Sequence, residues 1–254
     1  MNKLWTFGCS MTAGAELGSK IHVAEFLKKR TGCITVDDAK RKLGANYQRT
    51  IVPEWNKFLY TLDTYQEDPF LTYAGVISKK LNLKLESCAI SGSGIDQAFF
   101  KIIENSKNID WKKDLVILGV TTAGRWIPQS LSSGKHFSLS QLDINQHRKL
   151  DPYLPCIESM DMFHYGALTL IKKMFPAINI VRMYDNQNTA LINGIRIDPD
   201  DIYIGPKDLS LDGCCSGIAN NQYPGGHPIE EMHEKFAEQL LPYFYKINKR
   251  RLKA

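Results

Sequence analysis

A short apolar run near the amino terminus of this 254-residue chain ends abruptly in a turn of small residues. This junction constrains the fold more than any other stretch. Residues 4–7 (Leu-Trp-Thr-Phe) are typical of a buried β-strand, and the run breaks at residues 8–10 (Gly-Cys-Ser). Because α/β sheets bind their ligands just outside the carboxyl ends of their strands, Ser10 is predicted to lie where chemistry takes place. Ser10 is therefore the candidate nucleophile.

The composition is that of a globular protein whose chain can bury a substantial core. Hydrophobic residues make up 43% and charged residues 23%, so disorder is not expected. No apolar run reaches the roughly 18 residues that span a bilayer, and the start lacks the apolar core of a signal peptide. We therefore expect a cytoplasmic protein without a membrane partner. The net charge of +5 is spread along the chain, and solubility is an adequate explanation for it.

Two later junctions also place small or polar residues after a predicted strand. A turn at residues 91–94 (Ser-Gly-Ser-Gly) opens a helix that runs to about Ser106. This turn could hold a phosphate, but it lacks the lysine of a P-loop and the full dinucleotide pattern, and it could also be only a tight turn. Residues 114–119 (Asp-Leu-Val-Ile-Leu-Gly) are typical of a buried parallel strand. Arg125 and Trp126 follow it, and they either contact substrate or pack the loop.

His227 stands near the end of the chain, directly before Pro228. Proline suits the first turn of a helix, and Glu230 and Glu231 suit its positive amino end. A serine and a histidine that meet at one edge of a parallel sheet can form the activated hydroxyl of nucleophilic catalysis. Taken alone, His227 is a loop histidine that is either structural or such a base, whereas His233, inside the helix, is expected to pack or cap.

In this order, the four segments resemble the conserved blocks of the SGNH (GDSL-type) hydrolases. Residues 8–14 are similar to the first block, Gly-Asp-Ser-x-x-x-Gly, with Cys9 at the Asp position. Phe-Gly-Cys-Ser at this block looks like members encoded by bacteriophages, which implies a viral or bacterial cytoplasmic origin. The resemblance also implies a flavodoxin-like three-layer α/β/α fold with a parallel sheet of about five strands. It implies hydrolysis of esters, often O-acetyl groups on sugars, lipids or small esters, without a cofactor.

The resemblance assigns a role to each matching residue. Ser10 attacks the ester carbonyl and His227 takes its proton. The backbone N–H groups of Ser10 and Gly92, with help from Thr121, then hold the developing oxyanion.

Two further positions depart from the family pattern. Thr121 stands where the third block has Asn, although a hydroxyl can also donate a hydrogen bond. Pro224 stands where the fifth block has Asp, three residues before His227. His227 is then oriented either by another carboxylate, such as Asp212, or by a backbone carbonyl in a Ser-His dyad.

Two segments are longer than the crossovers of such a fold. Residues 15–68 and 128–165 are predicted insertions that form a cap or partner surface on a single domain spanning residues 1–254. In the first, residues 21–30 and 37–43 have helical spacing with many basic side chains, and aromatic residues follow. Such a pattern can bind nucleic acid or an acidic glycan, but we favour a solvated helix face over a satellite core.

The six cysteines lack metal-type spacing, because the adjacent pair at 214–215 is not a Cys-x-x-Cys. We therefore predict no metal and no cofactor. The expected partner is a small-molecule or glycan ester and not nucleic acid, and the sequence leaves the oligomeric state open. Three functions stay open: an ester hydrolase, a related O-acyltransferase that uses the same acyl-serine, and a binding protein with a catalytically retired site.

Overall fold

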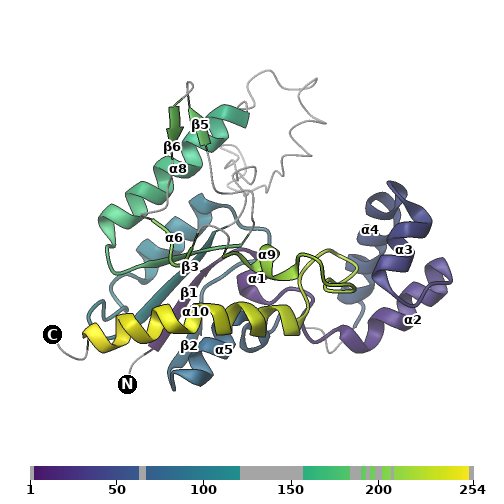
Figure 1. Ribbon diagram of the computed structural model, residues 1–254, viewed down its shortest axis with the longest axis horizontal. Coiled ribbons are helices and arrows are strands. Elements are labelled where there is room, and N and C mark those ends of the chain that lie inside the picture. Colours follow the sequence, from purple (N-terminus) through teal and green to yellow (C-terminus); the bar gives the residue numbers. More distant parts are fainter. Residues whose placement is uncertain are drawn as a thin grey trace.

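Four parallel strands form a central sheet in the order β2-β1-β3-β4 (Figure 1). In chain order they are β1 (Lys3–Gly8), β2 (Lys84–Ser87), β3 (Leu115–Val120) and β4 (Asn179–Arg182). β3 and β4 are buried at every position, as expected for parallel strands covered on both faces. The sheet confirms the predicted α/β class. Its order matches the first four strands of the flavodoxin-like order 2-1-3-4-5.

The computed structural model describes residues 3–62, 67–120, 157–183, 190–192, 195–197, 202–206 and 209–251. Within these residues the sheet has four strands, where about five were expected. Two isolated parallel bridges lie beside β4 instead, joining Ile180 to Tyr203 and Arg182 to Ser210. The chain therefore returns to the position of a fifth strand without forming a continuous ladder there.

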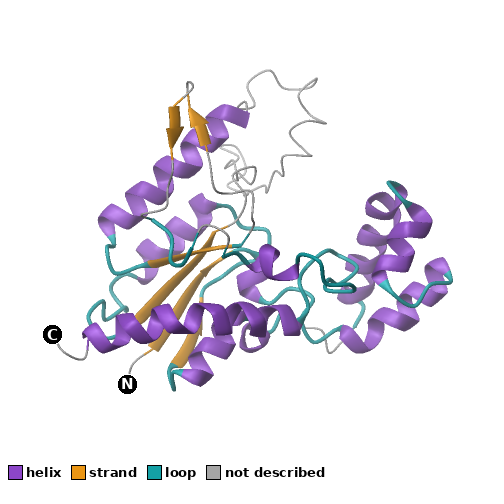
Figure 2. Cartoon of the chain, viewed as in Figure 1, coloured by secondary structure: helices purple, strands orange, loops and turns teal. Residues whose placement is uncertain are grey.

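Helices cover both faces of the sheet and give the three layers that were expected (Figure 2). One face packs against α5 (Tyr73–Lys80), α9 (Leu211–Cys215) and α10 (Glu230–Arg251). The other packs against α6 (Ile95–Asn105) and α8 (Ile157–Met174). Side chains of β3 alternate between the two cores, because successive residues of a strand point to opposite faces.

In the described part of the first predicted insertion, three helices project from one end of the sheet (Figure 1). We call α2 (Lys20–Thr31), α3 (Val36–Leu43) and α4 (Asn46–Tyr60) the helical arm. The arm has its own apolar cluster, which includes Phe26, Tyr47 and Trp55. The helical spacing predicted for α2 and α3 is confirmed. α4 was not predicted, and Pro53 lies inside it.

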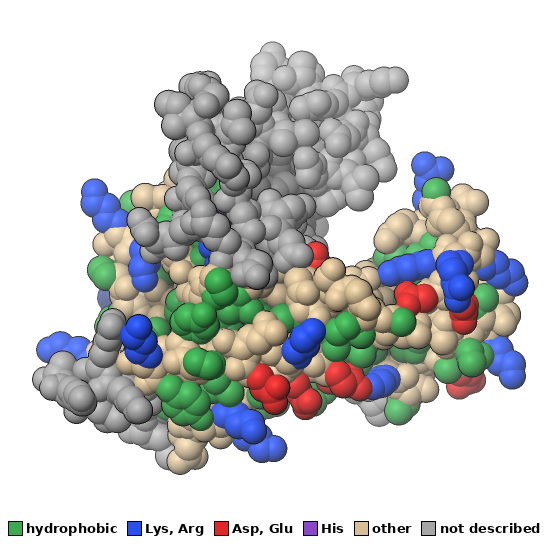
Figure 3. All heavy atoms as spheres, viewed as in Figure 1, with side chains coloured by type: hydrophobic (Ala, Val, Ile, Leu, Met, Phe, Trp, Pro, Cys, Tyr) green, Lys and Arg blue, Asp and Glu red, His purple; other side chains and the backbone are tan. Residues whose placement is uncertain are grey.

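Basic side chains gather on the arm, as Figure 3 shows for one face. Several of them lie in the last turns of α2 and α3. Some have acidic partners: Arg30 pairs with Glu54 at 3.1 Å, and Arg41 pairs with Asp38. This arrangement agrees with a solvated helix face over a satellite core.

The remaining elements are short. α1 (Ser10–Ala13) follows β1, and a 3-10 turn, η1 (Pro69–Leu71), precedes α5. β5 (Ala190–Ile192) and β6 (Ile195–Ile197) pair as an antiparallel hairpin. Most of the second predicted insertion lies outside the described residues. Among the described helices, none combines the length and the apolar character that crossing a bilayer requires.

Candidate active site

Ser10 lies just beyond the carboxyl end of β1, as the first residue of α1. β1 has β2 on one side and β3 on the other, which makes this the switch point where α/β sheets bind ligands. Gly8 allows the chain to turn close to β3. Its φ is +145°, and a Cβ added there would lie 2.5 Å from the carbonyl oxygen of Gly119. Ser10 is thereby fixed at the edge of the sheet, with 4% of the residue exposed.

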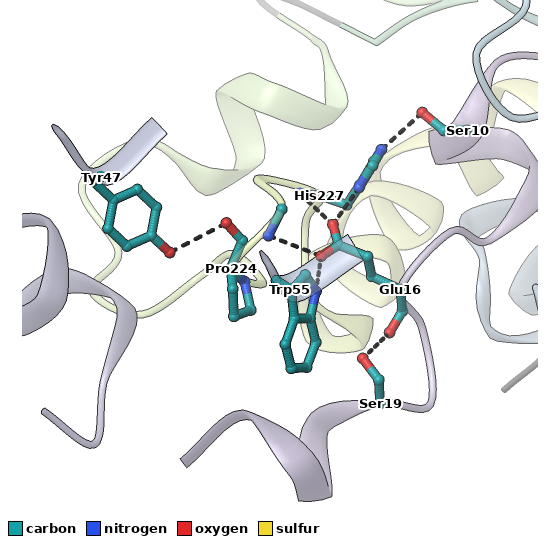
Figure 4. Close-up of polar contacts among 8 residues, drawn as sticks. Ser10, Glu16, Ser19, Tyr47, Trp55, Pro224 and His227 are labelled. Atoms are coloured by element: carbon teal, nitrogen blue, oxygen red, sulfur yellow. Dashed lines mark hydrogen bonds and ion pairs between the residues drawn. The ribbon is translucent and has the colours of Figure 1, made fainter. Parts of the chain in front are cut away.

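His227 lies in the loop before α10, and its ring stands between Ser10 and Glu16 (Figure 4). Its Nε2 atom is 2.8 Å from Oγ of Ser10. Its Nδ1 atom contacts Oε2 of Glu16. An imidazole with an alcohol on one nitrogen and a carboxylate on the other has the connectivity of a Ser-His-acid triad.

Glu16 is the site residue that the sequence did not reveal. Only 2% of it is exposed, and its φ of +67° lies in the left-handed region that non-glycine residues rarely adopt. Its carboxylate accepts hydrogen bonds from the backbone N–H groups of Gly225 at 2.8 Å and His227 at 3.1 Å, and from the indole N–H of Trp55. These donors compensate for the cost of burying a charge.

Asp212 does not take the place suggested for it, because Glu16 occupies Nδ1 of His227. Asp212 lies in the first turn of α9, and its backbone N–H donates to the carbonyl of Met183 at 2.9 Å. Pro224, at the position where the resemblance expects Asp, accepts a hydrogen bond from Tyr47 through its carbonyl. The carboxylate comes from the opposite end of the chain, six residues after the serine.

A signal for Glu16 was present but weak. It is the single charged residue in Gly-Ala-Glu-Leu-Gly, residues 14–18, a stretch that begins four residues after the candidate nucleophile. Burial of such a residue needs partners, but the local sequence does not say which.

A cavity of about 490 Å³ opens at Ser10 and His227. The turn before α6 forms part of its wall with Ser91 and Gly92. This turn is tied to β1, because the hydroxyl of Ser93 donates to the carbonyl of Gly8 at 2.8 Å. The structure therefore brings Gly92 to the same cavity as Ser10 and His227.

The far wall of the cavity comes from the helical arm and the segment after it. Asn56, Leu59 and Tyr60 line it from the last turns of α4, together with Leu62 and Glu67. Tyr60 is 86% exposed. An aromatic ring next to amide and carboxylate groups gives this wall both a flat apolar face and hydrogen-bonding partners.

Three predicted residues, Thr121, Arg125 and Trp126, lie outside the described residues. β3 ends at Val120, directly before Thr121. Within the part of the chain that is described, no group of three or more His, Cys, Asp or Glu side chains could hold a metal ion.

His233 packs inside the protein, as expected. It is 1% exposed, and its Nδ1 accepts the backbone N–H of Tyr73 at 3.2 Å. Burial, with a smaller contribution from the charge of His227, lowers the pKa of His233 to about 3. His233 is therefore neutral near pH 7.

No protein-family model matches this sequence, and a search of curated proteins finds no match. Among solved structures, the chain is similar to the acetyl xylan esterase Est2A from the rumen bacterium Butyrivibrio proteoclasticus, with 14% identity and a TM-score of 0.36. That match covers 96% of this chain and 63% of Est2A, so the chain spans less than two thirds of that protein.

Two further matches also cover 96% of this chain at 11% identity. One is a carbohydrate esterase whose active site has divergent catalytic and non-catalytic binding functions, with 68% of that protein covered and a TM-score of 0.46. The other is the lipase Lip_vut3 from a goat rumen metagenome, with 98% covered and a TM-score of 0.43. These structural neighbours are esterases and lipases. Likenesses this distant assign no activity, so the function below is derived from the site itself.

Proposed function

We propose that this protein is a serine ester hydrolase in which Ser10 is the nucleophile, His227 the general base and Glu16 the acid of the triad. The observation that carries the proposal is the position of the His227 ring between Oγ of Ser10 and the carboxylate of Glu16. A carboxylate on Nδ1 favours the tautomer with its proton on that nitrogen. Nε2 is then free to accept the proton of Ser10.

The reaction follows from these positions. Oγ of Ser10 attacks the ester carbonyl while Nε2 of His227 takes the hydroxyl proton. His227 then gives that proton to the departing alcohol, which leaves an acyl group on Ser10. A water molecule, deprotonated by His227, attacks the acyl group, and the proton returns to Ser10 as the carboxylic acid leaves. Glu16 stabilises the imidazolium that forms in each half of the reaction.

The developing oxyanion needs hydrogen-bond donors. We assign this role to the backbone N–H groups of Ser10 and Gly92, which border the same cavity, and to Thr121 as a further donor. Removing one such donor costs roughly 3 kcal/mol of transition-state stabilisation in enzymes of this kind.

The cavity supports an ester of a ring-bearing alcohol, such as an acylated carbohydrate. The exposed ring of Tyr60 offers a flat surface, while Asn56 and Glu67 can hydrogen-bond to hydroxyl groups. Arg125 and Trp126 stay predicted substrate contacts. The resemblance of residues 7–10 to bacteriophage-encoded members and the cytoplasmic location also stay predictions.

Serine labelling combined with ester turnover tests the proposal. Wild-type protein should hydrolyse p-nitrophenyl acetate and be labelled at Ser10 by a fluorophosphonate probe. Ser10→Ala and His227→Ala should lose turnover, while Ser216→Ala, at an exposed serine, should keep both properties. Folded wild-type protein that neither turns over the ester nor reacts at Ser10 would contradict the proposal and favour a retired binding site.

A further inference from the structure

The helical arm contacts the acid of the proposed triad directly. The indole N–H of Trp55, on α4, donates to Oε1 of Glu16 (Figure 4). The same carboxylate oxygen also accepts the backbone N–H of Gly225. The other oxygen, Oε2, faces His227. Trp55 is fully buried, so water does not compete for this hydrogen bond.

The arm also contacts the loop that carries His227. The hydroxyl of Tyr47 donates to the carbonyl of Pro224 at 3.1 Å, and Lys40 donates to the side chain of Gln222 at 2.9 Å. Burial and the negative charge of Glu16 raise the pKa of Tyr47 well above its usual value, so its hydroxyl remains a donor. The helical arm thus contacts both Glu16 and the loop that carries His227.

Packing alone does not require an indole at this position. The Trp55 ring lies against Phe26, with ring centroids 5.0 Å apart, and against Phe58 at 5.5 Å. A phenylalanine could fill much of that space, whereas the hydrogen bond to Glu16 needs the N–H group. The buried carboxylate is also the kind of group for which loss of one donor is costly.

We propose that the helical arm is part of the catalytic apparatus and that Trp55 is a positioning residue, which acts by holding the Glu16 carboxylate on Nδ1 of His227. This inference rests on the proposed function and extends it to a segment that the sequence suggested only as a cap or partner surface. Without the indole N–H, Glu16 loses a donor that fixes its orientation, and the His227 ring loses part of its alignment toward Ser10.

The test compares Trp55→Phe with Trp111→Phe. Trp111 is a matched control, because its indole N–H donates to the carbonyl of Ser106 and its ring stacks on Phe175, before the amino end of β3. Trp55→Phe should lower kcat for p-nitrophenyl acetate about tenfold or more with little change in KM, while Trp111→Phe should not. Thermal unfolding of both variants reports any general loss of stability.

A double-mutant cycle separates positioning from packing. In a Glu16→Gln background, Trp55→Phe should lower kcat by less than about threefold, because the group that it positions is already impaired. An equal loss in both backgrounds would overturn the inference, as would wild-type kcat in Trp55→Phe.

If Trp55→Phe folds poorly, a second substitution at the same position tests the inference. Replacing Trp55 with 3-benzothienylalanine keeps the shape of the ring and removes only the N–H group, and it should reproduce the loss in kcat. If this variant matches an active wild type, the positioning role fails and the proposed function stands. If wild-type protein is itself inactive and unlabelled at Ser10, the proposed function fails and the inference with it.

Discussion

Replacing Glu16 with glutamine should change which nitrogen of His227 carries the proton. Glutamine keeps the shape of the side chain but has one acceptor oxygen and one NH₂ group. Four N–H groups point at the carboxylate: those of Trp55 and Gly225 at Oε1, and the backbone N–H and Nδ1 of His227 at Oε2. A glutamine cannot accept from all four.

The two orientations of the new amide differ in cost. If its NH₂ group faces Trp55 and Gly225, one buried donor and one partly buried donor lose their acceptor, each at roughly 1–3 kcal/mol. If its NH₂ group faces His227, only the backbone N–H loses its acceptor, because Nδ1 can accept a hydrogen bond in the other tautomer. The second orientation is therefore favoured. It places the ring proton on Nε2, where the imidazole cannot take a proton from Ser10.

The expected result is a fall in kcat of about 10⁴-fold, the loss found when the triad acid of a serine protease is made an amide. This fall corresponds to roughly 5 kcal/mol of activation free energy. The assay is the initial rate with p-nitrophenyl acetate over a range of pH, with thermal unfolding to show that the variant folds. Asp212→Asn is the matched control and should retain wild-type kcat. A Glu16→Gln variant within tenfold of wild type, or an equal loss in Asp212→Asn, would refute the reasoning.

Three further changes test other parts of the site and the core. Gly225→Ala should lower kcat about 100-fold, because the added Cβ would overlap the Glu16 carboxylate, and steady-state kinetics that show no loss would contradict this contact. Tyr60→Ala should raise KM for an acetylated oligosaccharide more than for p-nitrophenyl acetate; equal changes for the two esters would remove the ring from the substrate site. His233 has a folded-state pKa of about 3, so the stability that it contributes is complete above about pH 6.5 and is lost as the pH falls toward 3. His233→Asn keeps an acceptor for the backbone N–H of Tyr73 but does not titrate. Between pH 7 and 4.5, the free energy of unfolding measured in urea should therefore fall by about 3 kcal/mol less in this variant than in wild type. An equal fall in both proteins would contradict the assignment.

Sequence patterns located the parts of the fold that are encoded locally. The apolar run before Ser10 and the run at residues 114–119 predicted strands, because burial on both faces selects continuous apolar residues. A turn of small residues after a strand placed Ser10 at the edge of the sheet. The residues that mark the start of the last helix placed His227 in the loop before that helix. These signals depend only on near neighbours in the chain.

The partner of His227 could not be found in this way. Glu16 is separated from His227 by 211 residues, and its role depends on the loop before α10 lying against the segment after α1. Asp212 is closer to His227 in the sequence than Glu16 is, but proximity in the sequence does not decide which carboxylate reaches the ring. α4 was missed for a similar reason, since Pro53 disfavours a helix locally, while burial of Ile51, Trp55 and Leu59 in the arm stabilises one.

The tautomer of His227 can be observed by ¹⁵N NMR of protein labelled at histidine, near neutral pH. We expect the proton on Nδ1 and a bare Nε2 in wild-type protein, with the proton moved to Nε2 in Glu16→Gln. A wild-type His227 that carries its proton on Nε2 would contradict the assignment of His227 as the base that activates Ser10.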